Sequence, residues 1–199
     1  FKYRNPAIIL ADGVIGQMME KVVLPEQRTR LTDEEVIARC PWATTGRTHH
    51  RTPNIITSLE LDPAEMEKRN IHLQKKYAEI EENEVRFEEL HCEDAEYLIV
   101  AFGSCARIAQ KAMEMAREEG IKVGLLRPIT LWPFPSKAIA ARAAQVKGIL
   151  TVELNAGQMV EDVRLAVKCK VPVEHFGRLG GIVPDPDEVI TALKEKLIK

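Results

Sequence analysis

In this chain of 199 residues, a group of polar side chains follows a predicted strand at residues 149–152. Glu153, Asn155 and Gln158 stand there beside Gly157, at the carboxyl end of a predicted strand. In open α/β sheets this edge is where ligands and partners collect. The group could line a site, or it could form a tight turn in which Asn155 caps the next helix. We expect Asn155 and Gln158 to fix a turn that contacts another domain, and we favour this role over contact with a cofactor. The backbone N–H groups of the following helix are expected to face outward.

A second candidate is the segment from Gly103 to Arg107, which follows a strand and opens a helix. Free backbone N–H groups at such a position can bind an anion. However, the segment carries neither GxGxxG nor a P-loop. We therefore interpret Ser104 mainly as a helix N-cap, and Ser104 stands in no GxSxG nucleophile elbow.

Metal chemistry has little support from spacing. The pair His49-His50 has no HExxH or HxH pattern beside it, and His175 stands alone. The four cysteines lie 52, 13 and 64 positions apart without a CxxC pair, so neither a zinc site nor an iron–sulfur cluster is indicated. We expect no metal site. These cysteines are Cys40, Cys92, Cys105 and Cys169.

Composition narrows the class of partner. Hydrophobic residues make up 45% of the chain and the formal net charge is −2, which excludes a general attraction to nucleic acid or to an anionic membrane. The longest apolar run, residues 97–102, is far shorter than the ~20 residues of a membrane helix. No signal peptide is visible. Scattered unpaired cysteines then favour the reducing cytoplasm.

Strands and helices alternate from residue 97 to the C-terminus. Each apolar strand is followed by an amphipathic helix, which is typical of a mostly parallel sheet covered by helices on both faces. The sequence therefore predicts an α/β fold. The expected strands are residues 97–102, 123–126, 149–152 and 171–176.

The first half of the chain is less regular. We predict a strand at 7–11 and a short helix that carries Gly16 and Gln17 and ends before Pro25. An irregular connection follows over 26–62, and then a helix from Pro63 to about Glu89 with one narrow apolar stripe. Such a helix is expected to pack along a surface. Because the chain opens on Phe1 just before a strand, we expect a fragment of a longer protein.

Four motifs in order along the chain resemble signatures of the α-type subunits of 2-oxoacid:ferredoxin oxidoreductases. They are ADGVIGQM (11–18, leading to VVLPE at 22–26), GIKVGLLRPITLWPFP (120–135), VELNAGQMVEDV (152–163) and FGRLGG (176–181). Residues 54–59 and 73–86 look most like the branched-chain, 2-oxoisovalerate members, with 2-oxoglutarate or pyruvate as alternative substrates. The resemblance covers essentially the whole chain.

The resemblance implies three parts: the end of a pyrimidine-binding domain (1–25), a connection with a long helix (26–95) and a transketolase C-terminal-like α/β domain (96–199). In the whole enzyme it implies thiamine diphosphate held between this subunit and a partner subunit, coenzyme A as acyl acceptor, and iron–sulfur clusters that pass electrons to ferredoxin. The family's catalytic glutamate would precede Phe1.

This chain is therefore expected to hold no catalytic residue and no cofactor by itself, and to act as scaffold and subunit interface. The competing hypotheses are a free-standing enzyme of another α/β family and a non-catalytic interaction or assembly module. The candidate interface or active-site rim consists of Gly16, Gln17, Ser104, Arg107, Asn155, Gly157 and Gln158.

Overall fold

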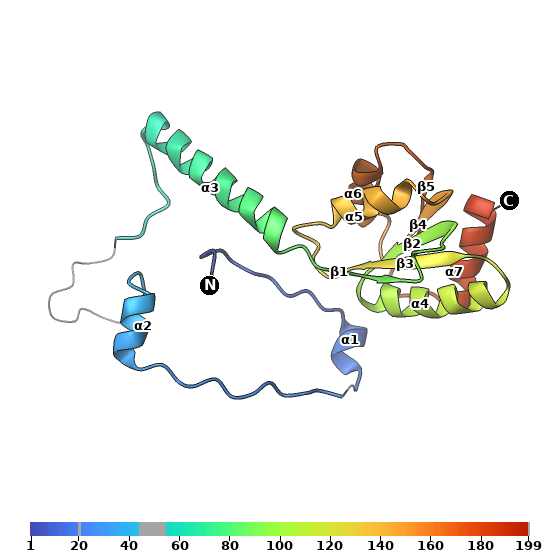
Figure 1. Ribbon diagram of the computed structural model, residues 1–199, viewed down its shortest axis with the longest axis horizontal. Helices are drawn as coiled ribbons and strands as arrows, with labels where there is room; N and C mark the ends of the chain where they lie inside the picture. The colour runs from blue at the N-terminus through green and yellow to red at the C-terminus, as the bar shows by residue number, and fades with distance from the viewer. Residues whose placement is uncertain (20, 44–54, 199) are drawn as a thin grey trace. The chain divides into compact units, whose positions relative to one another are not determined.

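The computed structural model describes residues 1–19, 21–43 and 55–198 (Figure 1). The chain forms two compact units, one made of Phe1–Met18 with Gln74–Lys199 and the other of Met19–Leu73. The histidine pair at 49–50 lies outside the described residues.

A five-stranded sheet forms the centre of the first unit. Its strand order is β1-β3-β2-β4-β5, and all pairs are parallel except that of β1 with β3. β2 and β4 are buried along nearly their whole length, which explains why their sequences are mostly apolar and lack alternation with exposed polar residues. The strands are β1 (Phe87–Leu90), β2 (Tyr97–Ala101), β3 (Val123–Pro128), β4 (Gly148–Glu153) and β5 (Val173–Gly177).

Helices cover both faces of this sheet (Figure 1). Alternate strand residues divide between two hydrophobic clusters: Ile99 and Leu150 pack with α4 and α7, whereas Leu98 and Ile149 pack with α5 and α6. The predicted α/β fold, mostly parallel and covered on both faces, is confirmed. The helices are α4 (Gly103–Glu118), α5 (Ser136–Ala143), α6 (Met159–Val167) and α7 (Pro186–Leu193), followed by the π-helical turn η1 (Lys194–Ile198).

Three predictions for the first half of the chain are wrong. Residues 7–11 form no strand, because no strand in the described part of the chain pairs with them; only the short helix α1 (Gly13–Gln17) appears. The 26–62 connection contains a helix, α2 (Asp33–Arg39), which begins with a capping box between Thr32 and Glu35. The long helix α3 (Pro63–Asn83) ends before Phe87, which pairs in β1 instead.

The two ends of α3 belong to different units. Its start is capped by Asp62, whose Oδ1 accepts hydrogen bonds from the N–H groups of Ala64 (2.8 Å) and Glu65 (3.1 Å). Near its other end Ile80 is buried, and the Tyr77 ring meets the Trp132 ring edge-on at 5.7 Å. The last turns of the helix are therefore packed on the α/β unit.

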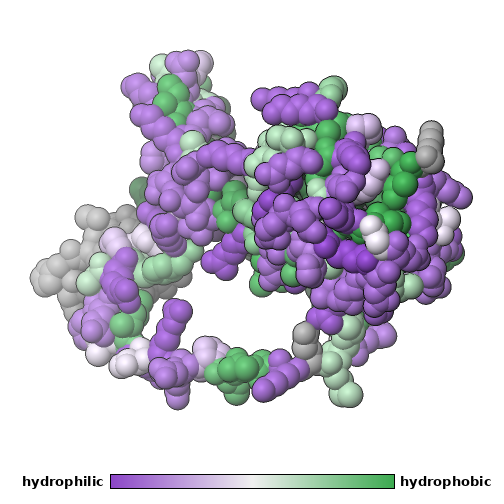
Figure 2. All heavy atoms as spheres, turned by 45° about the vertical axis from the view of Figure 1, so that its right-hand side comes forward, coloured by the Kyte–Doolittle hydropathy of each residue, from purple (hydrophilic) through white to green (hydrophobic). Residues whose placement is uncertain are grey.

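Many large apolar side chains in the first half of the chain are exposed. Ile9 is 96% exposed, and residues 22–24 form a run of three exposed apolar side chains. The stretch between α1 and α2 accordingly shows a group of hydrophobic side chains in Figure 2. No helix in the described ranges is long and apolar enough to cross a membrane.

Candidate functional site at the carboxyl edge of the sheet

The order of the strands places a topological switch point between β2 and β4. From β2 the chain goes first to β3 on one side and later to β4 on the other. In open α/β sheets the crevice outside the carboxyl ends of such strands is the usual binding place. Here β2 ends before Phe102 and β4 ends at Glu153, so both segments singled out from the sequence lie at this edge.

Glu153 carries a carboxylate that is buried inside this edge, with 1% of the residue exposed. Its Oε2 accepts hydrogen bonds from the N–H groups of Gln158 (3.2 Å) and Met159 (2.8 Å), and its Oε1 accepts one from Val160 (3.0 Å). These donors open α6, where a negative charge is favourable. The expectation that these N–H groups face outward is wrong, because a side chain of the same chain already binds them.

Asn155 fixes the turn after β4 but does not cap α6 as one alternative predicted. Its Oδ1 accepts the N–H of Gly157 (2.7 Å), and its Nδ2 donates to Glu153 Oε2 (3.2 Å). Gly157 has a φ of +111°, which disfavours any side chain. Gln158 stands at the N-cap position without a side-chain hydrogen bond to the helix. The turn is thus held by Asn155, and the helix is capped by Glu153.

His175 belongs to this network, although the sequence shows it as isolated. Its Nδ1 lies 3.4 Å from Glu153 Oε1 and 3.3 Å from Thr151 Oγ1, and its Nε2 lies 3.3 Å from the backbone oxygen of Asn155. Sequence reasoning could have found His175 by pairing the last two predicted strands, because Thr151 and His175 stand opposite each other in that pair.

Gly177 at the end of β5 supports the same turn. A Cβ at this position would overlap the backbone oxygen of Asn155 and crowd the His175 ring. The first glycine of the FGRLGG motif is therefore required by packing against the 153–158 turn.

Ser104 does not act as the predicted N-cap of α4. Phe102 holds that position, and Ser104 lies buried inside the first turn, where its Oγ donates to Asp12 Oδ2 (2.7 Å). Asp12 also caps α1 by accepting the N–H of Ile15 at Oδ1 (2.8 Å). The Ile15 amide and then the Ser104 hydroxyl hold the pKa of the Asp12 carboxyl below its ordinary value.

The predicted rim residues therefore form two groups. Gly16 and Gln17 are exposed on α1, which Asp12 ties to the start of α4. Arg107 is exposed within the first two turns of α4. The second group is the Asn155, Gly157 and Gln158 turn described above.

A small cavity of about 160 Å³ opens at the switch point. Phe102, Phe134 and Met159 supply apolar walls, and Glu153 and Asp162 supply carboxylates. Sites for drug-sized ligands are roughly 300–1,000 Å³. The cavity is smaller than this range, and the Glu153 oxygens beside it already accept hydrogen bonds from the chain itself.

Two features of the described residues bear on a diphosphate group and on metal ligands. The first N–H groups of α6 are occupied by Glu153, so they offer no diphosphate site. Burial raises the pKa of both the Cys92 and the Cys105 thiols to about 11, which leaves them protonated and poor cluster ligands. No set of three or more His, Cys, Asp or Glu side chains within the described ranges could hold a metal ion.

Comparison with known proteins identifies the class. Residues 95–189, which contain strands β2 to β5 and helices α4 to α6, match the family described as pyruvate:ferredoxin oxidoreductase core domain II. The chain belongs with the α-type subunits of the 2-oxoacid:ferredoxin oxidoreductases, so the predicted family is confirmed.

Individual relatives agree with this assignment. The chain is 44% identical over 194 residues to the ketoisovalerate oxidoreductase subunit VorB of Methanothermobacter marburgensis, covering 98% of this chain and 53% of that protein. It is 31% identical over 188 residues to the 2-oxoglutarate synthase subunit KorA of Archaeoglobus fulgidus, covering 93% and 52%. The chain thus spans about half the length of these curated relatives.

A solved structure supports the fold. The 2-oxoglutarate:ferredoxin oxidoreductase from Magnetococcus marinus, with 2-oxoglutarate, coenzyme A and succinyl-CoA bound, matches with a TM-score of 0.65 and 24% identity. The match covers 74% of this chain and 27% of that one.

Proposed function

We propose that this chain is part of a subunit of a thiamine diphosphate-dependent oxidoreductase that oxidises a branched-chain 2-oxoacid, such as 2-oxoisovalerate, to its acyl-CoA. The observation that supports the substrate assignment is the 44% identity to a ketoisovalerate oxidoreductase subunit, compared with 31% identity to a 2-oxoglutarate synthase subunit over a similar length. Coenzyme A, iron–sulfur clusters and ferredoxin would act in the whole enzyme. 2-Oxoglutarate and pyruvate are the alternative substrates.

Within that enzyme, we assign this part the role of scaffold and subunit interface without a catalytic residue. The support is that the polar groups at the switch point bind one another, and that no buried side-chain nitrogen or oxygen in the described residues lacks a partner. Exposed apolar side chains such as Ile9 and Met19 require a covering surface in an assembly. Residues 1–25 would end a preceding pyrimidine-binding domain, 26–95 would connect, and 96–199 would form the second domain.

The substrate is tested with the whole enzyme, purified with its partner subunits. Reduction of ferredoxin with coenzyme A and each of the three 2-oxoacids should give the highest kcat/KM for 2-oxoisovalerate. A preference for 2-oxoglutarate would overturn the branched-chain assignment and leave the subunit assignment intact.

The role of this part is tested separately. The purified chain of 199 residues should turn over none of the three acids with a dye acceptor, because Glu153 already binds the first N–H groups of α6 and the sequence has no CxxC pair for a cluster. Turnover by the isolated chain would overturn the scaffold role. If an assembly that contains the chain oxidises no 2-oxoacid, the alternative of a non-catalytic assembly module is favoured.

A further inference from the structure

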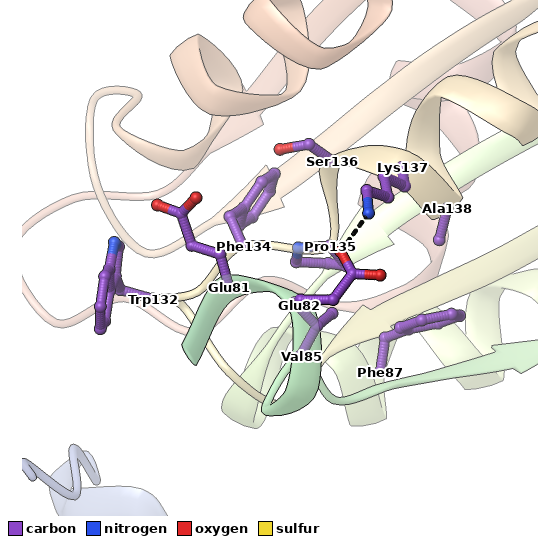
Figure 3. A pocket seen from close by; sticks show the side chains of 10 residues that line it. All are labelled: Glu81, Glu82, Val85, Phe87, Trp132, Phe134, Pro135, Ser136, Lys137 and Ala138. Atoms are coloured by element: carbon purple, nitrogen blue, oxygen red, sulfur yellow. Dashed lines mark hydrogen bonds and ion pairs between the residues drawn. The ribbon is translucent and has the colours of Figure 1, made fainter. Parts of the chain in front are cut away.

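A larger pocket of about 740 Å³ lies between the C-terminal end of α3, β1 and the loop that joins β3 to α5 (Figure 3). Its walls include the rings of Phe87, Trp132 and Phe134. All of its lining residues belong to the α/β unit. The volume falls in the range of small-molecule sites, and predominantly apolar walls with a few polar groups are typical of such sites.

Hydrogen bonds fix the aromatic loop in place. The N–H groups of Ile129 (3.0 Å) and Thr130 (3.1 Å) donate to the backbone oxygen of Arg86, and the Arg86 N–H donates to Thr130 Oγ1 (3.0 Å). The Tyr77 ring packs edge-on against Trp132, with an interplanar angle of 89°. Trp132 is nevertheless 52% exposed. The pocket is therefore preformed. Little of a ligand's binding free energy would be spent on ordering the pocket residues.

The charges around the pocket do not cancel. Glu82 and Lys137 form an exposed ion pair at 2.5 Å, shown as the dashed line in Figure 3. In the described part of the chain Glu81 has no ion-pair partner, and its carboxylate projects on the side of the pocket where Trp132 and Phe134 lie (Figure 3). One uncompensated negative charge thus stands beside aromatic rings.

We propose that this pocket binds a small organic cation, an ammonium or guanidinium group carried on an apolar body. Aromatic faces attract cations through their quadrupole, and an adjacent carboxylate adds a charge–charge attraction. The apolar body would lie against Phe87 and Phe134, with the cationic group between Trp132 and Glu81. An anion would meet Glu81 and Glu82, and a neutral ligand would leave the Glu81 charge unused. This site is independent of the 2-oxoacid proposed above.

Trp132 is itself the reporter for a test, because the chain has only two tryptophans. In a Trp42→Phe background, titration with benzylamine at neutral pH should change Trp132 fluorescence saturably. Benzyl alcohol, the neutral analogue, should bind at least about five-fold more weakly. Glu81→Gln should weaken benzylamine about three-fold, while Glu79→Gln, an exposed glutamate on the same helix outside the pocket, should leave it unchanged.

Three results would overturn the proposal: no saturable change, equal binding of amine and alcohol, or equal binding by wild type and Glu81→Gln. The same titration on the assembled enzyme distinguishes a small ligand from a protein one. Benzylamine binding that persists in the assembly supports a small-molecule site. Binding that is lost on assembly shows instead that a neighbouring chain fills the pocket, and the proposal is then wrong.

Discussion

Replacing Glu153 by Gln tests how far the switch-point edge depends on one buried carboxylate. Its two oxygens accept three backbone N–H bonds and one from Asn155 Nδ2. Glutamine keeps a single acceptor oxygen, and its NH₂ group would face at least one backbone donor of α6. A hydrogen bond to a charged group contributes about 1.5–3 kcal/mol, and loss of a helix cap costs about 1 kcal/mol. Part of this loss is offset, because a neutral amide costs less to bury than a carboxylate. We expect a net loss of about 2–4 kcal/mol in the free energy of unfolding.

Urea denaturation followed by far-UV circular dichroism measures this loss. With an m-value of about 2 kcal/mol/M, the midpoint should fall by about 1–2 M while m stays constant. The matched control is Glu161→Gln, which removes an exposed carboxylate from the first turn of the same helix and should cost less than about 1 kcal/mol. Equal midpoints for the two variants would refute the capping role of Glu153.

Other consequences can be checked in the same chain. Asn155→Ala removes two hydrogen bonds and should lower thermal stability by about 1–2 kcal/mol; loss of assembly with unchanged stability would make it an interface residue instead. The Asp12 pKa is lowered on folding, so its stabilising effect is present above its ordinary value of 3.8 and is lost as the pH falls through the folded pKa. Asp12→Asn should therefore destabilise the chain at about pH 6, and this difference should shrink as the pH falls below 3.8; a pH-independent difference would contradict this. With a thiol reagent at about pH 8, exposed Cys169 should react quickly and Cys92, with its pKa of about 11, only on unfolding; a fast phase that survives Cys169→Ser would contradict this.

The sheet could be predicted because burial on both faces leaves a plain signature. Residues 97–102 are apolar without alternation, residues 149–152 are apolar except for Thr151, and amphipathic segments separate them. The end of α3 could not be predicted in this way. Phe87 continues the apolar spacing of the helix, but pairing opposite Pro128 places it in the edge strand β1. Local periodicity carries no information about that distant partner.

The position of the polar residues at the carboxyl end of β4 could be predicted from the sequence, but their contacts could not. What they bind depends on the direction of each side chain. The Glu153 carboxylate accepts hydrogen bonds from N–H groups five to seven residues later in the sequence. Ser104 pairs with Asp12, 92 positions away, and no spacing rule connects them.

The glycine at the end of β5 also determines how the last strand can align. β5 is an edge strand, with only one neighbour to hold it, and edge strands are where slippage is least resisted. Opposite Glu153, only a residue without a Cβ clears the Asn155 oxygen. A shift by one position would bring Phe176 or Arg178 to that place and would also turn every β5 side chain to the wrong face. Because neither Phe176 nor Arg178 can take this place without overlapping the Asn155 oxygen, Gly177 holds β5 in the observed register.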